Sequence, residues 1–110
     1  MPSSTLELMP GTVDVLVLRT LAWGPMHGYA ISQLVRNRTA GAIAIQSAAL
    51  YQALHRLERK KLVRGWWGVS DTNRRSKFYE LTATGRKQLR SQSTDLRAYV
   101  AALLAVLDAE

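Results

Sequence analysis

The chain has 110 residues and a mass of 12.3 kDa, the size of one small domain, and its 47% apolar content is too high for a disordered chain. It has no cysteine and only two histidines, which excludes disulfide frameworks, thiol catalysis and thiolate metal sites. Fifteen Lys and Arg against eight Asp and Glu give a net charge of +7, which favours an anionic partner, nucleic acid first and a membrane surface second.

The first third of the chain predicts two helices. Val13, Leu16, Val17 and Leu21 fall on one face of a helix over residues 12–23, with Thr12 as its cap and Gly24-Pro25 as its end. A second helix is predicted from Met26 or His27 to Arg38. Residues 42–46 alternate weakly and are predicted as a short strand.

A third helix is predicted to begin with Ser47 as its N-cap and to end at Lys60-Lys61. Leu50, Leu54 and Leu57 form a narrow apolar stripe, so one face packs and the other is free. The free face carries Gln52, His55, Arg56 and Arg59.

The next segment predicts a β-hairpin, with strands over residues 62–69 and 77–82. The polar loop between them, Ser70–Ser76, is expected to carry Arg74 and Arg75 at its tip. On the second strand, Tyr79 and Leu81 should point inward, while Phe78 and Glu80 should face the other way. Trp66 and Trp67 are adjacent and therefore face opposite sides of the first strand, and their roles stay open.

The last segment predicts a helix of about 25 residues, capped by Thr82 or Thr84 and ending near Asp108, roughly 38 Å long at 1.5 Å per residue. Such a helix extends beyond a core built from about 80 residues, so its apolar stripe needs a partner chain. The residues expected to form the dimer contact are Leu89, Leu96, Tyr99, Val100, Leu103 and Leu107.

This order of elements predicts a mainly α protein with a small β-hairpin. It consists of a winged helix-turn-helix DNA-binding domain over residues 1–82 and a long C-terminal dimerisation helix over residues 83–110. A helix about 12 Å across fits the major groove, and a basic hairpin tip reaches phosphates or a minor groove beside it. The predicted DNA-binding residues are Ser47, Tyr51, Gln52, His55 and Arg56 on the helix and Arg74, Arg75 and Lys77 on the hairpin.

The sequence also resembles the PadR-type transcriptional regulators, in their short form with a single C-terminal helix. The matching segments are Met9–Thr12, Leu21–Ile31, Leu50–Glu58, Asn73–Tyr79 and Leu81–Arg86. The resemblance implies a homodimeric, cytoplasmic repressor that binds double-stranded DNA and is often released by a small molecule. Many relatives have Gly-Ser before the Leu-Tyr pair and Pro after it, whereas this chain has Ala48-Ala49 and Gln52, which affects the operator recognised.

An effector is the least supported part of this resemblance. Some relatives bind flat aromatic compounds between the dimer helices through a tryptophan on the last helix, where this chain has only Tyr99. We therefore keep a small aromatic effector as an open prediction.

Other functional classes fit the sequence less well. No catalytic residues are predicted, because the acidic residues are scattered and no Ser/His/Asp set or Gly-rich phosphate loop is present. No cofactor or metal is predicted, and His27 is expected to pack at a helix start. No targeting or membrane-spanning segment is apparent, so a soluble cytoplasmic protein without membrane contact is expected. A non-specific architectural DNA-binding protein and a basic protein-interaction module stay as alternatives.

Overall fold

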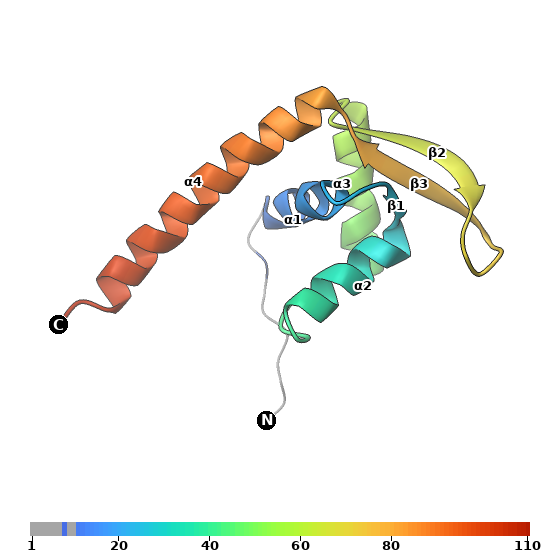
Figure 1. Cartoon of the computed structure of the whole chain (residues 1–110). Coiled ribbons are helices and arrows are strands. Elements are labelled where there is room, and N and C mark those ends of the chain that lie inside the picture. Colours follow the sequence, from blue (N-terminus) through green and yellow to red (C-terminus); the bar gives the residue numbers. More distant parts are fainter. Residues whose placement is uncertain (1–7, 9–10) are drawn as a thin grey trace.

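The computed structural model describes Leu8 and residues 11–110. Met9 and Pro10, which begin the first of the matching segments, lie outside the described residues. The helices and strands follow the order expected of a winged helix, apart from one short additional strand (Figure 1). They are α1 (Thr12–Leu21), β1 (Met26–His27), α2 (Gly28–Arg38), α3 (Ser47–Arg59), β2 (Val63–Val69), β3 (Arg75–Leu81) and α4 (Ala83–Leu107).

The sheet has three antiparallel strands in the order β1-β3-β2. The hairpin pairs Trp66 with Phe78 and Val69 with Arg75, and β1 adds Met26 opposite Tyr79 on the other side of β3. The prediction that the second helix starts at Met26 or His27 was therefore wrong, because these two residues form β1. A two-residue strand has no periodicity of its own, and only its pairing with β3 defines it.

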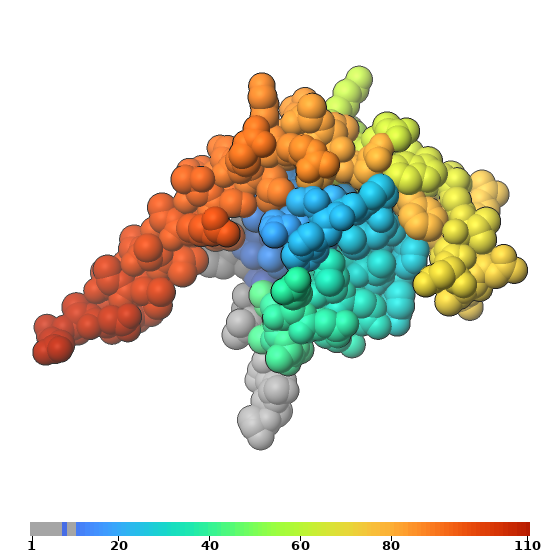
Figure 2. Space-filling view, in the orientation of Figure 1, coloured from blue at the N-terminus to red at the C-terminus, as the bar shows by residue number. Residues whose placement is uncertain are grey.

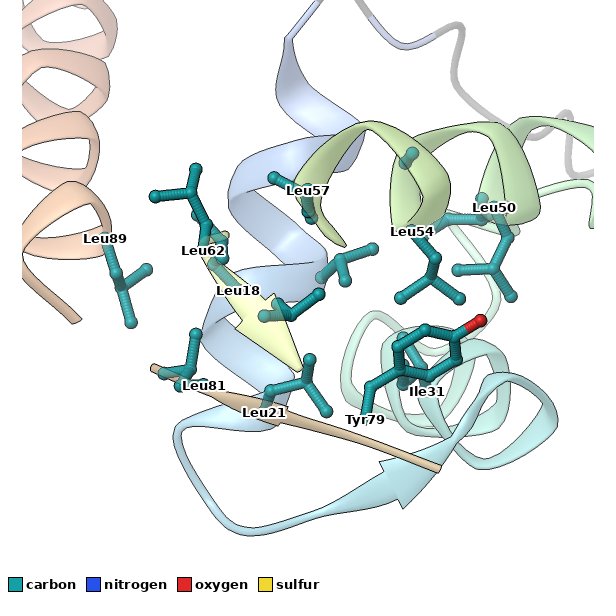
Figure 3. Close-up of a cluster of buried hydrophobic side chains, with 14 of the residues drawn as sticks. Leu18, Leu21, Ile31, Leu50, Leu54, Leu57, Leu62, Tyr79, Leu81 and Leu89 are labelled. Atoms are coloured by element: carbon teal, nitrogen blue, oxygen red, sulfur yellow. The ribbon is translucent and has the colours of Figure 1, made fainter. Parts of the chain in front are cut away.

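A single core joins the three helices of the body to the sheet (Figure 3). Leu18, Ile31 and Leu54 are fully buried, and each comes from a different helix. Tyr79 and Leu81 point into this core from β3, as predicted from strand alternation, with 5% and 8% of their surfaces exposed.

The start of α4 also belongs to this core. Thr82 is the N-cap, with its side-chain oxygen accepting a 3.0 Å hydrogen bond from the Gly85 amide. Gly85 is needed because a Cβ there would lie 2.0 Å from the Leu62 carbonyl oxygen. Leu89 lies beside Leu62 and Leu81 and is only 8% exposed (Figure 3). The expectation that Leu89 is part of an unpartnered stripe was wrong, because the chain buries this residue itself.

Several predicted boundaries also require correction. Thr12 and Ser47 are the first helical residues of α1 and α3, and Gly11 and Gln46 are the N-caps. The segment 42–46 is not a strand, since its alternation arises from Ile43 and Ile45 packing onto the core. The second hairpin strand begins at Arg75 instead of Lys77, so Arg75 is in the sheet and not in the loop.

Candidate nucleic-acid interface

The exposed face of α3 is polar and lies opposite the residues that the helix buries. Leu50, Ala53, Leu54 and Leu57 form the buried side. At 100° per residue, the centre of the opposite side consists of Ala48, Gln52, His55 and Arg59, all of which are exposed, and Ser47 is exposed at the start of the helix. The sequence analysis placed Arg59 on the free face but did not include it among the DNA-binding residues. Its spacing of four residues from His55 and seven from Gln52 is the signal that identifies it.

Tyr51 borders this face and packs against the start of α2. It is 54% exposed, and its ring lies directly over Gly28, where a Cβ would approach the phenol oxygen to 3.1 Å. Any side chain at position 28 would therefore displace the ring. The structure thus places Tyr51 half packed, with much of its surface open to solvent.

The hairpin carries its two arginines differently from the prediction. A turn over Asp71–Asn73 forms the tip, closed by a 2.8 Å hydrogen bond from the Ser70 amide to the Arg74 carbonyl, with Asn73 at a φ of 62°. Arg74 follows this turn, and Arg75 begins β3. The guanidinium of Arg75 stacks on the Trp67 ring, 5.0 Å from its centroid. Arg75 is therefore oriented by the sheet and by an indole, not carried on a flexible tip.

The two adjacent tryptophans have separate environments on the two faces of the hairpin. Trp67, 59% exposed, is on the same face as Lys77 and the Arg75 guanidinium. Trp66 is on the other face, where it stacks on Phe78 with centroids 6.1 Å apart. Phe78 in turn meets the His27 ring edge-on, at 5.4 Å. Trp66 and Trp67 therefore lie on opposite faces of the hairpin, as strand alternation predicts.

His27 has a structural role. Its Nδ1 accepts a 3.2 Å hydrogen bond from the Ala30 amide and caps the start of α2. The packing role expected from the sequence is confirmed.

Two of the predicted DNA-binding cations already have partners within the chain. Arg56 donates to Asp14 of α1 at 2.7 Å, and Lys77 donates to Glu58 of α3 at 2.9 Å. The hydrogen bond that Lys77 donates to Glu58 stabilises the charged lysine and raises its pKa above the ordinary value of 10.5. Arg56 and Lys77 are thus held by carboxylates in the chain without DNA, and their predicted contact with DNA stays a prediction.

A groove of about 1100 Å³ separates the start of α2 from the hairpin. Tyr29, Tyr51 and Trp67 supply aromatic walls, and Arg74 and Arg75 supply positive charge. Neither arginine is in an ion pair with any residue of the described chain. Aromatic surface combined with unpaired guanidinium groups suits a phosphate-sugar backbone, because a guanidinium donates hydrogen bonds to phosphate in a fixed fork.

A family model and a curated relative match most of this chain. The model described as "Transcriptional regulator PadR-like family" matches residues 17–91. An uncharacterized protein of Lysinibacillus sphaericus is 36% identical over 84 residues, which make up 76% of this chain and 76% of that protein.

Transcriptional regulators are among the solved structures that this chain resembles. A transcriptional regulator from Clostridium thermocellum matches with a TM-score of 0.77 and 28% identity, covering 84% of this chain and 90% of that one. A PadR family transcription regulator from Clostridium difficile matches with a TM-score of 0.74 and 26% identity, covering 90% of this chain and 100% of that one. Among the helices of the described residues, none has both the length and the apolar composition of a membrane span.

Proposed function

The chain belongs to the PadR-like family of transcriptional regulators, which regulate by binding DNA, and from this premise we propose that it acts in the cytoplasm as a sequence-specific repressor. In this proposal the protein binds a palindromic operator as a homodimer. The observation that carries it is the exposed polar face of α3 beside an arginine-bearing hairpin, with both attached to one core.

In the proposed complex, α3 enters the major groove. Ser47, Gln52, His55 and Arg59 face the base edges, and Tyr51 lies at the border with the backbone. An amide such as that of Gln52 suits adenine, and a guanidinium suits the O6 and N7 acceptors of guanine. Arg74 and Arg75 then lie at the adjacent backbone, where they hold the helix in register.

The dimer is proposed to form through the far half of α4. The C-terminal part of this helix projects away from the body of the chain (Figures 1 and 2). It exposes a run of large apolar side chains, with 44–49% of the surface of Tyr99, Val100, Leu103 and Leu104 open and 76% of that of Val106 and Leu107. Exposed apolar surface of this extent on a small chain is typical of an interface between subunits. We propose that Leu96, Tyr99, Val100, Leu103 and Leu107 form this contact.

A homodimer with twofold symmetry presents two identical copies of α3. The two half-sites are then inverted repeats whose centres lie about one DNA turn, roughly 34–36 Å, or a multiple of it apart. Repression and release by a small molecule are the outcomes that the family resemblance implies. Tyr99 is exposed on α4 where an aromatic effector between the dimer helices would lie, and this part of the proposal stays a prediction.

The proposal is tested by selecting genomic fragments that the protein binds and titrating them against random DNA at one salt concentration. We expect a shared inverted repeat, bound at least about 10³-fold more tightly than random DNA. The same experiment should recover promoter regions. Expression of a reporter from one of these promoters should increase when the gene for this protein is deleted. Equal affinity for selected and random DNA would instead support the non-specific architectural alternative.

A further inference from the structure

An ion pair joins the proposed reading helix to the hairpin. Lys77 of β3 and Glu58 of α3 are 19 positions apart in the sequence, and their side chains meet at 2.9 Å. Both side chains are about one-third exposed, at 31% and 33%, so the contact lies at the junction of the two elements and is partly shielded from solvent. A partly buried pair is held more firmly than a freely solvated surface pair.

The backbone around this pair leaves room for it. A Cβ at Gly65 of β2 would lie 2.7 Å from Lys77 Cε and 3.0 Å from Glu58 Oε2. Any larger residue would therefore push the lysine stem away from the carboxylate. On the other side, Lys77 Nζ lies 5.5 Å from the centre of the Tyr79 ring, which adds a favourable cation–π contact.

The geometry of α3 gives this contact a role in orientation. Glu58 and Arg56 lie about 160° apart around the helix axis, so they leave it on opposite flanks. Glu58 binds the hairpin, and Arg56 binds Asp14 of α1. The face between these flanks, centred on Gln52, His55 and Arg59, is exposed. The helix is therefore held from both sides while its reading face remains open.

We propose that the Glu58–Lys77 pair sets the position of the hairpin relative to α3, and thereby the register between the major-groove contact and the hairpin contact within one half-site. Lys77 is then a positioning residue that does not touch DNA. This inference rests on the proposed function, since it concerns how the same DNA-binding surface achieves discrimination.

The test uses the operator found by the selection experiment and three single variants of the full chain. Lys77→Met and Glu58→Gln each remove the ion pair. Glu80→Gln is the matched control, because Glu80 pairs with Arg64 on the opposite face of the same hairpin and carries the same charge. The measurements are the ratio of operator affinity to random-DNA affinity at fixed salt, the slope of log K against log salt, and the thermal midpoint of unfolding.

We expect Lys77→Met and Glu58→Gln each to lower the operator-to-random ratio by about 3- to 30-fold, the range typical of residues that act through coupling. The double variant should lose no more than either single one, because both remove the same contact. The reversed pair, Glu58→Lys with Lys77→Glu, should recover most of the ratio. Glu80→Gln should leave the ratio unchanged, which separates loss of the pair from loss of a negative charge near DNA.

A hydroxyl-radical footprint adds a readout that general destabilisation would not change. Without the pair, protection of the backbone facing the hairpin should weaken or shift, while protection around the major-groove contact remains. If Lys77 is instead a phosphate contact, Lys77→Met will reduce the slope magnitude by roughly 1.8 for a dimer and leave the ratio intact, and the proposal is wrong.

The remaining outcomes are decisive as well. Lower thermal midpoints with unchanged ratios and footprints would assign the pair to stability alone and overturn the proposal. Should Lys77→Met fail to fold, Glu58→Gln alone distinguishes the cases, because freeing a DNA-contacting lysine would increase the slope magnitude, whereas losing a positioning contact lowers the ratio. If wild-type protein selects no operator, the proposed function has failed before this inference is tested.

Discussion

Helices α3 and α4 are both amphipathic, but they expose opposite kinds of surface. The 13 residues of α3 bury their apolar stripe in the core of the same chain and present a polar face to solvent. The 25 residues of α4 bury Leu89 near their start and then expose apolar side chains to their end. The apolar stripe of α3 is thus fully buried within one chain, and its polar face is left for a polar ligand. The far half of α4, by contrast, needs a second apolar surface to cover its stripe.

The largest expected effect comes from placing a charge on the exposed stripe of α4. Leu103 is 45% exposed in the single chain, so Leu103→Asp should leave the fold intact while burying an unpaired carboxylate in the dimer contact. We expect the free energy of dimer dissociation to fall by at least about 3 kcal/mol. Sedimentation velocity measures the association state, and far-UV circular dichroism measures the fold.

The control for this variant is Ser91→Asp, which adds the same charge at an exposed position of α4 outside the stripe. It should leave the dimer unchanged. If the Leu103→Asp protein sediments like wild type, the apolar face of α4 does not form the dimer contact. The proposed difference between α3 and α4 would then be wrong.

The near half of α4 should respond in a different way. Leu89→Ala leaves a cavity beside Leu62 and Leu81 in the chain's own core and should cost about 2–4 kcal/mol of unfolding free energy. Urea unfolding at a fixed protein concentration measures the loss, since dimerisation contributes to apparent stability. If Leu89→Ala instead prevents dimerisation and leaves the stability of the core unchanged, Leu89 belongs to the dimer contact and not to the core.

The polar face of α3 is tested by comparing two arginines three residues apart. Arg59 has no ion-pair partner among the described residues, whereas Arg56 is held by Asp14. Arg59→Ala should weaken operator binding by about 1–3 kcal/mol and relax discrimination at one base pair of each half-site. Arg56→Ala should instead resemble Asp14→Asn, with a small loss of stability.

Titration of both variants against operator and random DNA separates these roles. Equal losses on both DNAs for Arg59→Ala would make Arg59 a phosphate contact. Relaxed discrimination for Arg56→Ala, without the same effect in Asp14→Asn, would restore Arg56 as a base-reading residue.

The hairpin extends the polar surface of α3, and its charge and its aromatic surface can be tested separately. Arg75→Ala should reduce the magnitude of the slope of log K against log salt by roughly 1.8, since a dimer presents two hairpins and each phosphate contact contributes about 0.9. Operator preference should be nearly unchanged. Trp67→Ala should weaken binding with little change in slope, because it removes the surface that orients Arg75 but not the charge.

Trp66→Ala, on the opposite face of the hairpin, is the matched control and should leave DNA binding nearly unchanged. An unchanged slope for Arg75→Ala together with lost discrimination would show that Arg75 reads a groove instead of binding a phosphate.

The smallest expected effect is a loss of stability at alkaline pH, and it involves Tyr79 and Lys77, which lie where α3 meets the hairpin. Burial raises the pKa of Tyr79 above its ordinary value of 10.0, and Glu58 raises that of Lys77 above 10.5. Both groups hold their protons more tightly when folded, so their contribution is complete below pH 10 and is lost as pH rises through the raised values. Urea unfolding from pH 8 to 11.5 should show a constant midpoint followed by a decline. Lys77→Met should make that decline smaller.

Much of this protein could be predicted from local pattern alone. The apolar spacing of Leu50, Leu54 and Leu57 predicted both the helix and its free face, because a 3.6-residue period needs no information from elsewhere in the chain. Strand alternation predicted that Tyr79 and Leu81 point inward, and Thr82, the cap of α4, was one of the two threonines predicted for that role. The family resemblance rests on the same segments and was confirmed by the match over residues 17–91.

Tertiary structure alone decided which side chains are buried or paired within the chain. Strand β1 exists because β3 pairs with it, and Leu89 is buried because the start of α4 turns against Leu62 and Leu81. Arg56 and Lys77 were predicted to contact DNA from their places in the sequence alone, and the fold brings Asp14 and Glu58 to them from 42 and 19 positions away. Periodicity specifies the face of an element, but the partner across a contact depends on how distant elements pack, and that packing is set by the whole core.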